Sequence, residues 1–320
     1  MTAFRIPHEH GSPEGENSTY VFPKRGVVID PGPSGDRPYA TLCAGLDDRG
    51  LDLTDVGEIL VTHWHSDHAG LAPRLATAAK ARIHMHVQDV PLLSDYAVAR
   101  RRRTRRDAAT LERWGVPAPV VSNVRASDAP SSIPDTVPVV GHEDGDSVVG
   151  LTLHHTPGHT CGHVAVRADR TLYTGDAVLP MYTPNVGGSD TRTDGENPLA
   201  TYLDTLDRLS ELDVDPRARP GHGQSVCLPE RIETTREHHR ERVRAVVEAT
   251  PTEEMVTPWE VARTLFGEMS GIHAKMGAGE AAAHLTYAET LGFVERVDEQ
   301  PRTYRATARS KQAVERSMNH

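Results

Sequence analysis

One short stretch, VTHWHSDHAG at residues 61 to 70, limits the possible folds of this chain more than any other. It begins inside the apolar run EILVT (58 to 62), which predicts a buried strand, and it leads into the helical pattern AGLAPRLATAAKA. His63 and His65 lie two apart, so an extended backbone turns both side chains the same way, and Asp67 and His68 fall where the helix begins. Histidines also cluster by chance, and Asp67 could simply cap the helix. If neither explanation holds, the fold must bring several metal-binding side chains to the end of one strand.

The rest of the first two thirds alternates between strand and helix patterns. The runs STYVF and GVVID predict a hairpin, and RIHMHV predicts a further strand before a long helix over residues 90 to 115. A second β-rich block contains VVGLTLHHTPG, HVAVRA and TLYTGDAVL, and the amphipathic helix NPLATYLDTLDRLSEL follows it. Two β-rich halves, each followed by helix, predict an α/β protein whose two sheets pack face to face with helices outside.

The pattern changes near residue 229. A charged helical segment is followed by two more helical patterns and by the hairpin-like FVERVDEQPRTYRAT, an order typical of a winged helix. We therefore predict three parts: a catalytic domain over 1–228, a connecting helix over 229–250 and a winged-helix-like domain over 251–320. The last part has ten acidic and eight basic residues, which disfavours DNA binding. A packing role or a homodimer contact suits it better.

Charge and composition exclude several classes of partner. The formal net charge of -10 should repel nucleic acid and anionic membrane surfaces, so RNA is expected only as an alternative substrate. No segment has the length and apolarity of a membrane span or a signal peptide. The three cysteines, Cys43, Cys161 and Cys227, are widely spaced and suggest no disulfide framework. We expect a cytoplasmic protein that acts on a small molecule, with an anionic molecule as one option.

Three more candidate ligands occur at predicted strand ends further along the chain. His159 lies in TPGHTCGH, Asp176 in YTGDAV, and His222 between two glycines in RPGHGQS. Glycine beside a ligand removes the Cβ atom and permits unusual backbone angles, which close convergence on a metal requires.

Together these motifs resemble the metallo-β-lactamase fold superfamily, whose signature is His-x-His-x-Asp-His followed by a lone His, a lone Asp and a final His. The early Asn17 and VVIDPG (27 to 32) match a further pattern of that superfamily, and the resemblance covers roughly residues 15 to 228. It implies a four-layer αββα sandwich with the small C-terminal winged-helix domain appended. It also implies two metal ions per chain, zinc in the first place with iron or manganese as options. The implied ligands are His63, His65 and His159 for one ion, Asp67, His68 and His222 for the other, and Asp176 between them.

The residue at the bridging position narrows the implied chemistry. The commonest true β-lactamases have a cysteine where this chain has Asp176, so the pattern is more similar to glyoxalase II, in the branch with a C-terminal winged helix. The resemblance implies a hydrolase in which a metal-bridging hydroxide attacks a small ester or thioester, with Asp67 orienting the water and, as an option, moving a proton. Two alternatives stay open: a metal-dependent endoribonuclease acting on single-stranded RNA, and a mono-iron sulfur dioxygenase.

The strongly basic run RRRRTRR, residues 100 to 106, has two interpretations. It is either a solvated helix face or a positive rim that docks an anionic part of the substrate.

Overall fold

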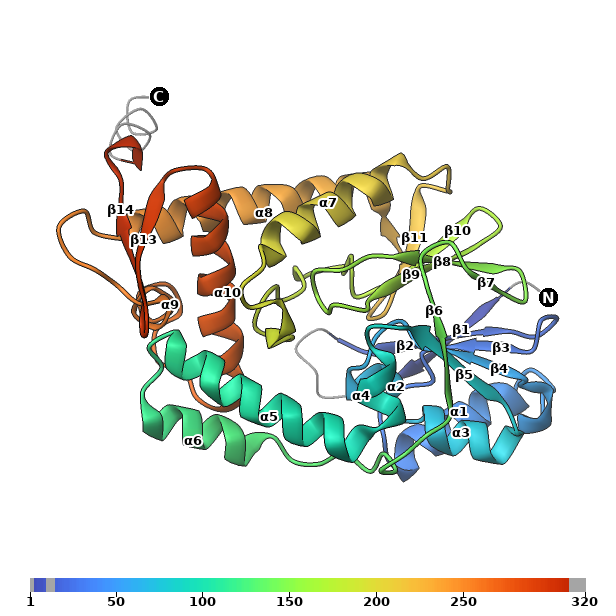
Figure 1. Cartoon of the computed structure of the whole chain (residues 1–320). Coiled ribbons are helices and arrows are strands. Elements are labelled where there is room, and N and C mark those ends of the chain that lie inside the picture. The colour runs from blue at the N-terminus through green and yellow to red at the C-terminus, as the bar shows by residue number, and fades with distance from the viewer. Residues whose placement is uncertain (1–2, 10–14, 311–320) are drawn as a thin grey trace. The chain divides into compact units, whose positions relative to one another are not determined.

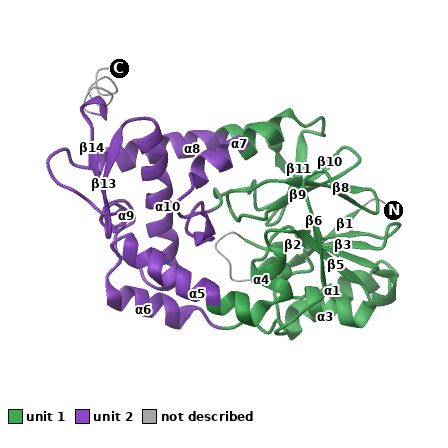
Figure 2. Cartoon of the chain, in the orientation of Figure 1, with its two compact units in different colours: residues 1–101, 130–184, 205–233 green, residues 102–129, 185–204, 234–320 purple. Residues whose placement is uncertain are grey.

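The computed structural model describes residues 3–9 and 15–310, and these form two compact units (Figure 2). Unit 1 comprises residues 1–101, 130–184 and 205–233, and unit 2 comprises residues 102–129, 185–204 and 234–320. The division into 1–228, 229–250 and 251–320 stays a prediction, and residues 311–320 of its last part lie outside the described residues. Within the described ranges no helix is long and apolar enough to cross a membrane.

Unit 1 contains two six-stranded sheets (Figure 1). The first has the order β1-β2-β3-β4-β5-β6, with antiparallel pairing from β1 to β3 and parallel pairing from β3 to β6. Its strands are β1 (Phe4–His8), β2 (Asn17–Phe22), β3 (Val27–Ile29), β4 (Glu58–Leu60), β5 (Arg82–His86) and β6 (Val139–His142). The second has the order β12-β11-β10-β9-β8-β7. Its strands are β7 (Ser147–Val148), β8 (Leu151–His155), β9 (Val164–Ala168), β10 (Thr171–Gly175), β11 (Arg217–Pro220) and β12 (Val226–Cys227).

Side-chain alternation along the first sheet explains why it is covered on both faces. Val28 and Ile59 face a core shared with the helices of unit 1, while Val27 and Leu60, their neighbours in sequence, face the second sheet. The first core includes residues of α1 (Asp36–Asp47) and α3 (Ala72–Ala79), and the second lies between the two sheets. The predicted sandwich of sheets with outer helices is therefore confirmed.

The remaining helices of unit 1 are short or are shared with unit 2. The short ones are η1 (Leu53–Asp55), α2 (Ser66–Ala69) and α4 (Val90–Ser94). The shared ones are α5 (Tyr96–Arg113), α7 (Pro198–Glu211) and α8 (Leu228–Glu248). The part of α7 in unit 1 buries Leu206 and Leu209 and joins the second sheet's loops through a hydrogen bond from Thr205 Oγ1 to the carbonyl of Pro157 (2.8 Å). The single helix predicted over 90 to 115 is in fact two, because the backbone leaves helical angles at Asp95 (φ -130°, ψ 50°).

Unit 2 is mainly helical and ends in a two-stranded antiparallel sheet. Its own elements are α6 (Ala118–Ser127), η2 (Thr191–Thr193), α9 (Pro258–Phe266), α10 (Gly271–Thr290), β13 (Val294–Glu299) and β14 (Arg302–Ala306). A capping box between Thr257 and Glu260 starts α9. The predicted order of helices followed by a hairpin is therefore present, whereas the winged-helix assignment stays a prediction.

Candidate metal centre

All seven predicted ligands come together at strand ends in unit 1. His63 and His65 lie in the loop that follows β4, and Asp67 and His68 lie in the first turn of α2. The other three follow β8, β10 and β11, as His159, Asp176 and His222 respectively. The predicted strand 58 to 62 ends earlier, at Leu60, so the first two histidines are carried by a loop rather than by the strand itself.

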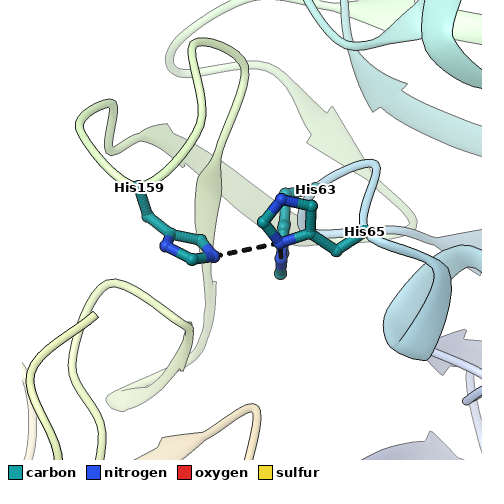
Figure 3. A group of neighbouring side chains, drawn as sticks. All are labelled: His63, His65 and His159. Atoms are coloured by element: carbon teal, nitrogen blue, oxygen red, sulfur yellow. Dashed lines mark hydrogen bonds between the residues drawn. The ribbon is translucent and has the colours of Figure 1, made fainter. Parts of the chain in front are cut away.

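The first group is made of three histidines, His63, His65 and His159, whose donor atoms lie within 4.8 Å of one another. Nδ1 of His65 lies 3.0 Å from Nε2 of His63 and 3.1 Å from Nε2 of His159. Figure 3 shows His159 reaching from its own loop toward His63 and His65. Three imidazoles that face one point can hold a divalent metal ion.

The second group combines Asp67, His68 and His222. The Nε2 atoms of the two histidines lie 3.2 Å apart, and Oδ2 of Asp67 lies 3.5 Å from His68 and 3.4 Å from His222. Asn17 Nδ2 donates a hydrogen bond to the same Oδ2 atom (3.1 Å). The N-cap position of α2 is occupied by His65, and Asp67 lies inside the first turn, so Asp67 is not the N-cap residue of this helix.

Asp176 lies between the two groups. Its Oδ2 atom is 3.8 Å from Nε2 of His159 and 3.4 Å from Nε2 of His222, and its Oδ1 atom is 3.4 Å from Nε2 of His68. Oδ1 is buried and makes no hydrogen bond, which is costly for a carboxylate unless a cation satisfies it. Five imidazoles and two carboxylates around such an atom are a donor set that suits divalent zinc, iron or manganese. The residues present therefore fit a metal centre, and their individual roles as ligands stay a prediction.

Burial keeps two imidazoles of the first group, His63 and His65, neutral. It lowers the pKa of His63 well below its ordinary value, and the positive charge of His68 lowers it further. Burial, with the nearby His159, also lowers the pKa of His65 to about 3. A neutral imidazole keeps a lone pair available for a metal, so these side chains are ready to coordinate without losing a proton.

The second group has the opposite charge balance. Burial alone would lower the pKa of His68, but Asp176, Asp67 and Asp30 outweigh it and raise that pKa well above the ordinary value. In the same way Asp176 raises the pKa of His222 to about 10 against the effect of burial. The carboxylates thus attract two positive charges, which protonated imidazoles supply when no metal does.

Glycines next to the cluster are needed for steric reasons. A Cβ atom on Gly221 would come within 2.3 Å of Asp176 Oδ1 and 2.8 Å of His68 Cε1. Gly175, with φ +49°, would meet His163 Nε2 at 2.7 Å. The expectation that glycine permits the close approach of the ligands is therefore confirmed at Gly221.

A buried aspartate behind the cluster holds His68 in place. Asp30 accepts hydrogen bonds from the backbone N–H and the hydroxyl of Thr62 (2.7 Å each), and its Oδ2 lies 3.0 Å from Nδ1 of His68. An acceptor at Nδ1 fixes the tautomer that leaves Nε2 free to bind a metal. The sequence marked Asp30 only as part of the VVIDPG pattern, and its role was missed.

A second aspartate, Asp89, connects two of the ligand loops. It is fully buried after β5 and accepts hydrogen bonds from the Trp64 N–H (3.2 Å), the Thr160 hydroxyl (3.0 Å) and the Gly162 N–H (3.0 Å). The first donor belongs to the loop of His63 and the other two to the loop of His159. An acidic residue directly after a predicted strand was the available signal for this position.

The arginine run lies on α5, and its members differ in their surroundings. Arg103 forms ion pairs with Asp107 (3.4 Å) and Asp128 (2.7 Å), whereas Arg102 and Arg105 are exposed. The buried Lys275 also pairs with Asp107 (2.8 Å). Part of the run therefore stabilises unit 2, and the docking of an anionic substrate on the exposed part stays a prediction.

Comparison with known proteins agrees with this geometry. A sequence profile described as the Metallo-beta-lactamase superfamily matches residues 11–222. The chain is 24% identical over 309 residues to the Probable metallo-hydrolase YqjP of Bacillus subtilis, which covers 90% of this chain and 92% of that protein. It is 26% identical over 196 residues to a Hydroxyacylglutathione hydrolase of Methylobacillus flagellatus, which covers 61% of this chain and 57% of that enzyme. The crystal structure of a metallo-beta-lactamase family protein from Thermus thermophilus superposes with a TM-score of 0.75 at 26% identity, over 95% of this chain and 98% of that one.

Proposed function

The chain belongs to the metallo-beta-lactamase superfamily, and on that basis we propose that it is a dinuclear metal-dependent hydrolase of a small ester or thioester. The predicted enzyme class, a metal-dependent hydrolase of this superfamily, is confirmed by the family match and by the relative named a metallo-hydrolase. The dinuclear centre, the choice of zinc and the substrate are our proposals.

One observation carries the dinuclear proposal. Asp176 places one carboxylate oxygen toward His159 of the first group and lies against His68 and His222 of the second. A carboxylate in contact with both groups, with one oxygen lacking any hydrogen bond, is the arrangement expected of a residue that joins two cations. A single ion in the first group would leave the second group without a role.

We assign the seven candidate ligands to the two proposed ions. His63, His65 and His159 would hold one ion, and Asp67, His68 and His222 the other, with Asp176 shared. When bound, such a pair of ions lowers the pKa of a water molecule and polarises the substrate carbonyl.

Asp67 is the more exposed of the two carboxylates in the cluster, and we place the proton on it. Its side chain is 25% exposed, whereas that of Asp176 is 2% exposed, so Asp67 is the carboxylate that an incoming water can reach. The hydrogen bond from Asn17 fixes its Oδ2 atom. Asp67 would orient the attacking water and accept its proton, and the deeply buried Asp176 would remain ionised between the cations.

The proposed substrate class is supported by one of the relatives. The Hydroxyacylglutathione hydrolase matches over 57% of its length, so its thioester substrate supports the class of bond rather than a glutathione ligand. No specific observation favours single-stranded RNA or a mono-iron oxygenation, and both stay as alternatives for the experiment to separate.

The experiment combines metal analysis with a substrate panel. Purified protein should contain close to two equivalents of transition metal, and it should hydrolyse a short acyl thioester or p-nitrophenyl ester in a chelator-sensitive way. The variant His65→Ala should lose metal and activity, while His142→Ala, a half-buried histidine of β6 outside the cluster, should keep both. One equivalent of iron with oxygen-dependent turnover would replace the hydrolase proposal with the oxygenase, and cleavage of RNA alone would replace the substrate.

A further inference from the structure

A pocket in unit 2 is lined by none of the seven candidate ligands. It has a volume of about 430 Å³. Its lining residues belong to α7, α8 and α10, which Figure 1 labels, and to the segment just after α10. Every lining residue belongs to unit 2. A volume of this size is within the range of small-molecule sites, which is roughly 300 to 1,000 Å³.

Six of the twelve described residues that line this pocket are apolar. The apolar lining includes Leu199 and Leu203 of α7, Val243 and Val247 of α8, and Leu291 and Phe293 beyond α10. Residues four apart lie on one face of a helix, so α7 and α8 each turn a pair of apolar side chains into the pocket. Leu203, Leu291 and Phe293 remain half-buried, which leaves apolar surface for a ligand to cover.

The same face of α8 carries a row of arginines. Arg236, Arg240 and Arg244 all line the pocket at intervals of four residues. Glu237 pairs with Arg240 (2.5 Å) and more distantly with Arg244 (3.8 Å), and Glu248 is the acidic residue of the lining. Glu237 offsets part of the charge of Arg240 and Arg244. Three arginines against two glutamates still leave the rim positive on a chain whose formal net charge is -10.

The histidine on the floor adds no charge. His239 is 3% exposed, and its Nδ1 lies 3.0 Å from Nε2 of His284, whose own Nδ1 donates to the carbonyl of Glu280 (2.7 Å). Burial lowers the pKa of His284 to about 3, so this ring is neutral. Because its Nδ1 donates to the carbonyl, its Nε2 accepts the hydrogen bond that His239 Nδ1 donates. Burial and the neighbouring His284 lower the pKa of His239 to about 2, in agreement with this assignment. An alkyl chain can therefore lie against the ring without meeting a cation.

We propose that this pocket binds an amphipathic anion, a fatty-acid-type molecule whose alkyl chain lies between α7, α8 and α10 and whose carboxylate meets the arginines of α8. Aliphatic walls and a rim of guanidinium groups complement the two ends of such a molecule, because each end finds the surroundings that it needs. The site is separate from the proposed hydrolytic function, since none of the candidate metal ligands lines it.

Calorimetric titration of the full chain with decanoate tests the proposal. We expect saturable binding of one decanoate per chain and clearly weaker binding of decanol and of decyltrimethylammonium. The double variant Arg240→Ala/Arg244→Ala should weaken decanoate binding about fivefold, the effect of removing two solvent-exposed charge contacts. The matched control Arg208→Ala removes an exposed arginine of α7 that pairs with Asp144, and it should bind like the wild type.

A filling variant tests the location. Leu203→Trp puts a bulky ring into the pocket from a half-buried position and should abolish binding while the melting temperature stays near that of the wild type. No saturable binding of decanoate to the wild type, or equal binding by Leu203→Trp, would overturn the proposal. Binding of decyl phosphate without binding of decanoate would overturn the carboxylate assignment.

Discussion

Asp30→Asn is the substitution that most directly tests how the metal centre is held. Asn is nearly isosteric with Asp and tolerates the left-handed backbone of this position, where φ is 47°, so the fold should persist. The amide oxygen can still accept from the Thr62 N–H, and the Thr62 hydroxyl can rotate to accept from the new NH₂ group. The contact with His68 Nδ1 cannot be kept, because two donors then face each other across 3.0 Å.

The cost follows from that single lost contact. In the neutral form that binds a metal, His68 relieves the clash by carrying its proton on Nε2, the atom that faces Asp176 and would bind the metal. The substitution removes one charge-assisted hydrogen bond and the preferred tautomer of His68, which together cost about 2 kcal/mol. This energy corresponds to a roughly 30-fold loss of metal affinity. Substitution of residues that support metal ligands usually lowers metal affinity by about 10- to 100-fold, so the value lies within that range. We therefore expect the metal in the second group to bind about 30-fold more weakly, and the first group to be little affected.

Competition for zinc against a chromophoric chelator measures both affinities. The control is Asp213→Asn, which removes the charge of an exposed aspartate paired with Arg170 (2.9 Å). That control should match the wild type. If Asp30→Asn also binds two equivalents with wild-type affinities, Asp30 does not set the tautomer of His68 and the reasoning fails.

Three further predictions concern the bridge, the acid stability of unit 2 and the arginine run. Asp176→Ala should lower hydrolysis by more than about 100-fold while circular dichroism stays unchanged, and wild-type turnover would refute the bridging role. Burial lowers the pKa of His239 to about 2 and of His284 to about 3, so the unfolded state binds more protons below pH 6.5 and stability is lost as the pH falls. By pH 5 each ring lowers the free energy of unfolding by about 2 kcal/mol. In urea titrations the free energy of unfolding of the double variant His239→Phe/His284→Leu should therefore fall less steeply with decreasing pH than that of the wild type. Arg102→Glu/Arg105→Glu should raise KM for an anionic substrate by a few-fold at low salt with kcat nearly unchanged, and an unchanged KM would identify these exposed residues as a solvated helix face.

The candidate ligands could be proposed from the sequence because they stand at local boundaries between secondary-structure elements. His63, His159 and Asp176 follow strands that the sequence predicts, because each strand end shows a switch from an apolar run to a Gly- or Pro-rich turn or a polar segment. His222 was recognised from the glycines on either side of it. The two-sheet arrangement followed from the same alternation of β-rich and helical segments.

What escaped prediction depends on contacts between distant segments. Strand β1 contains Pro7 and lies at a sheet edge, and β11 reads RARP, so neither has the apolar pattern of a strand. The bond from Asp89 to the loop of Thr160 and the pair between Lys275 and Asp107 join residues that local periodicity cannot relate. For the same reason the sequence could not divide the arginine run into paired and exposed members.

The spacing of the ligands along the chain has a consequence for folding. His63 and His222 are about 160 residues apart, and the loops between them belong to both sheets, so a bound metal pair would act as a cross-link across most of unit 1. By the chain-entropy relation that describes disulfides, closing a loop of that length removes about 5 kcal/mol of chain entropy from the unfolded state. The metals would then stabilise the fold in addition to their catalytic role. In a cell short of metal, the protein would unfold more easily between its two sheets.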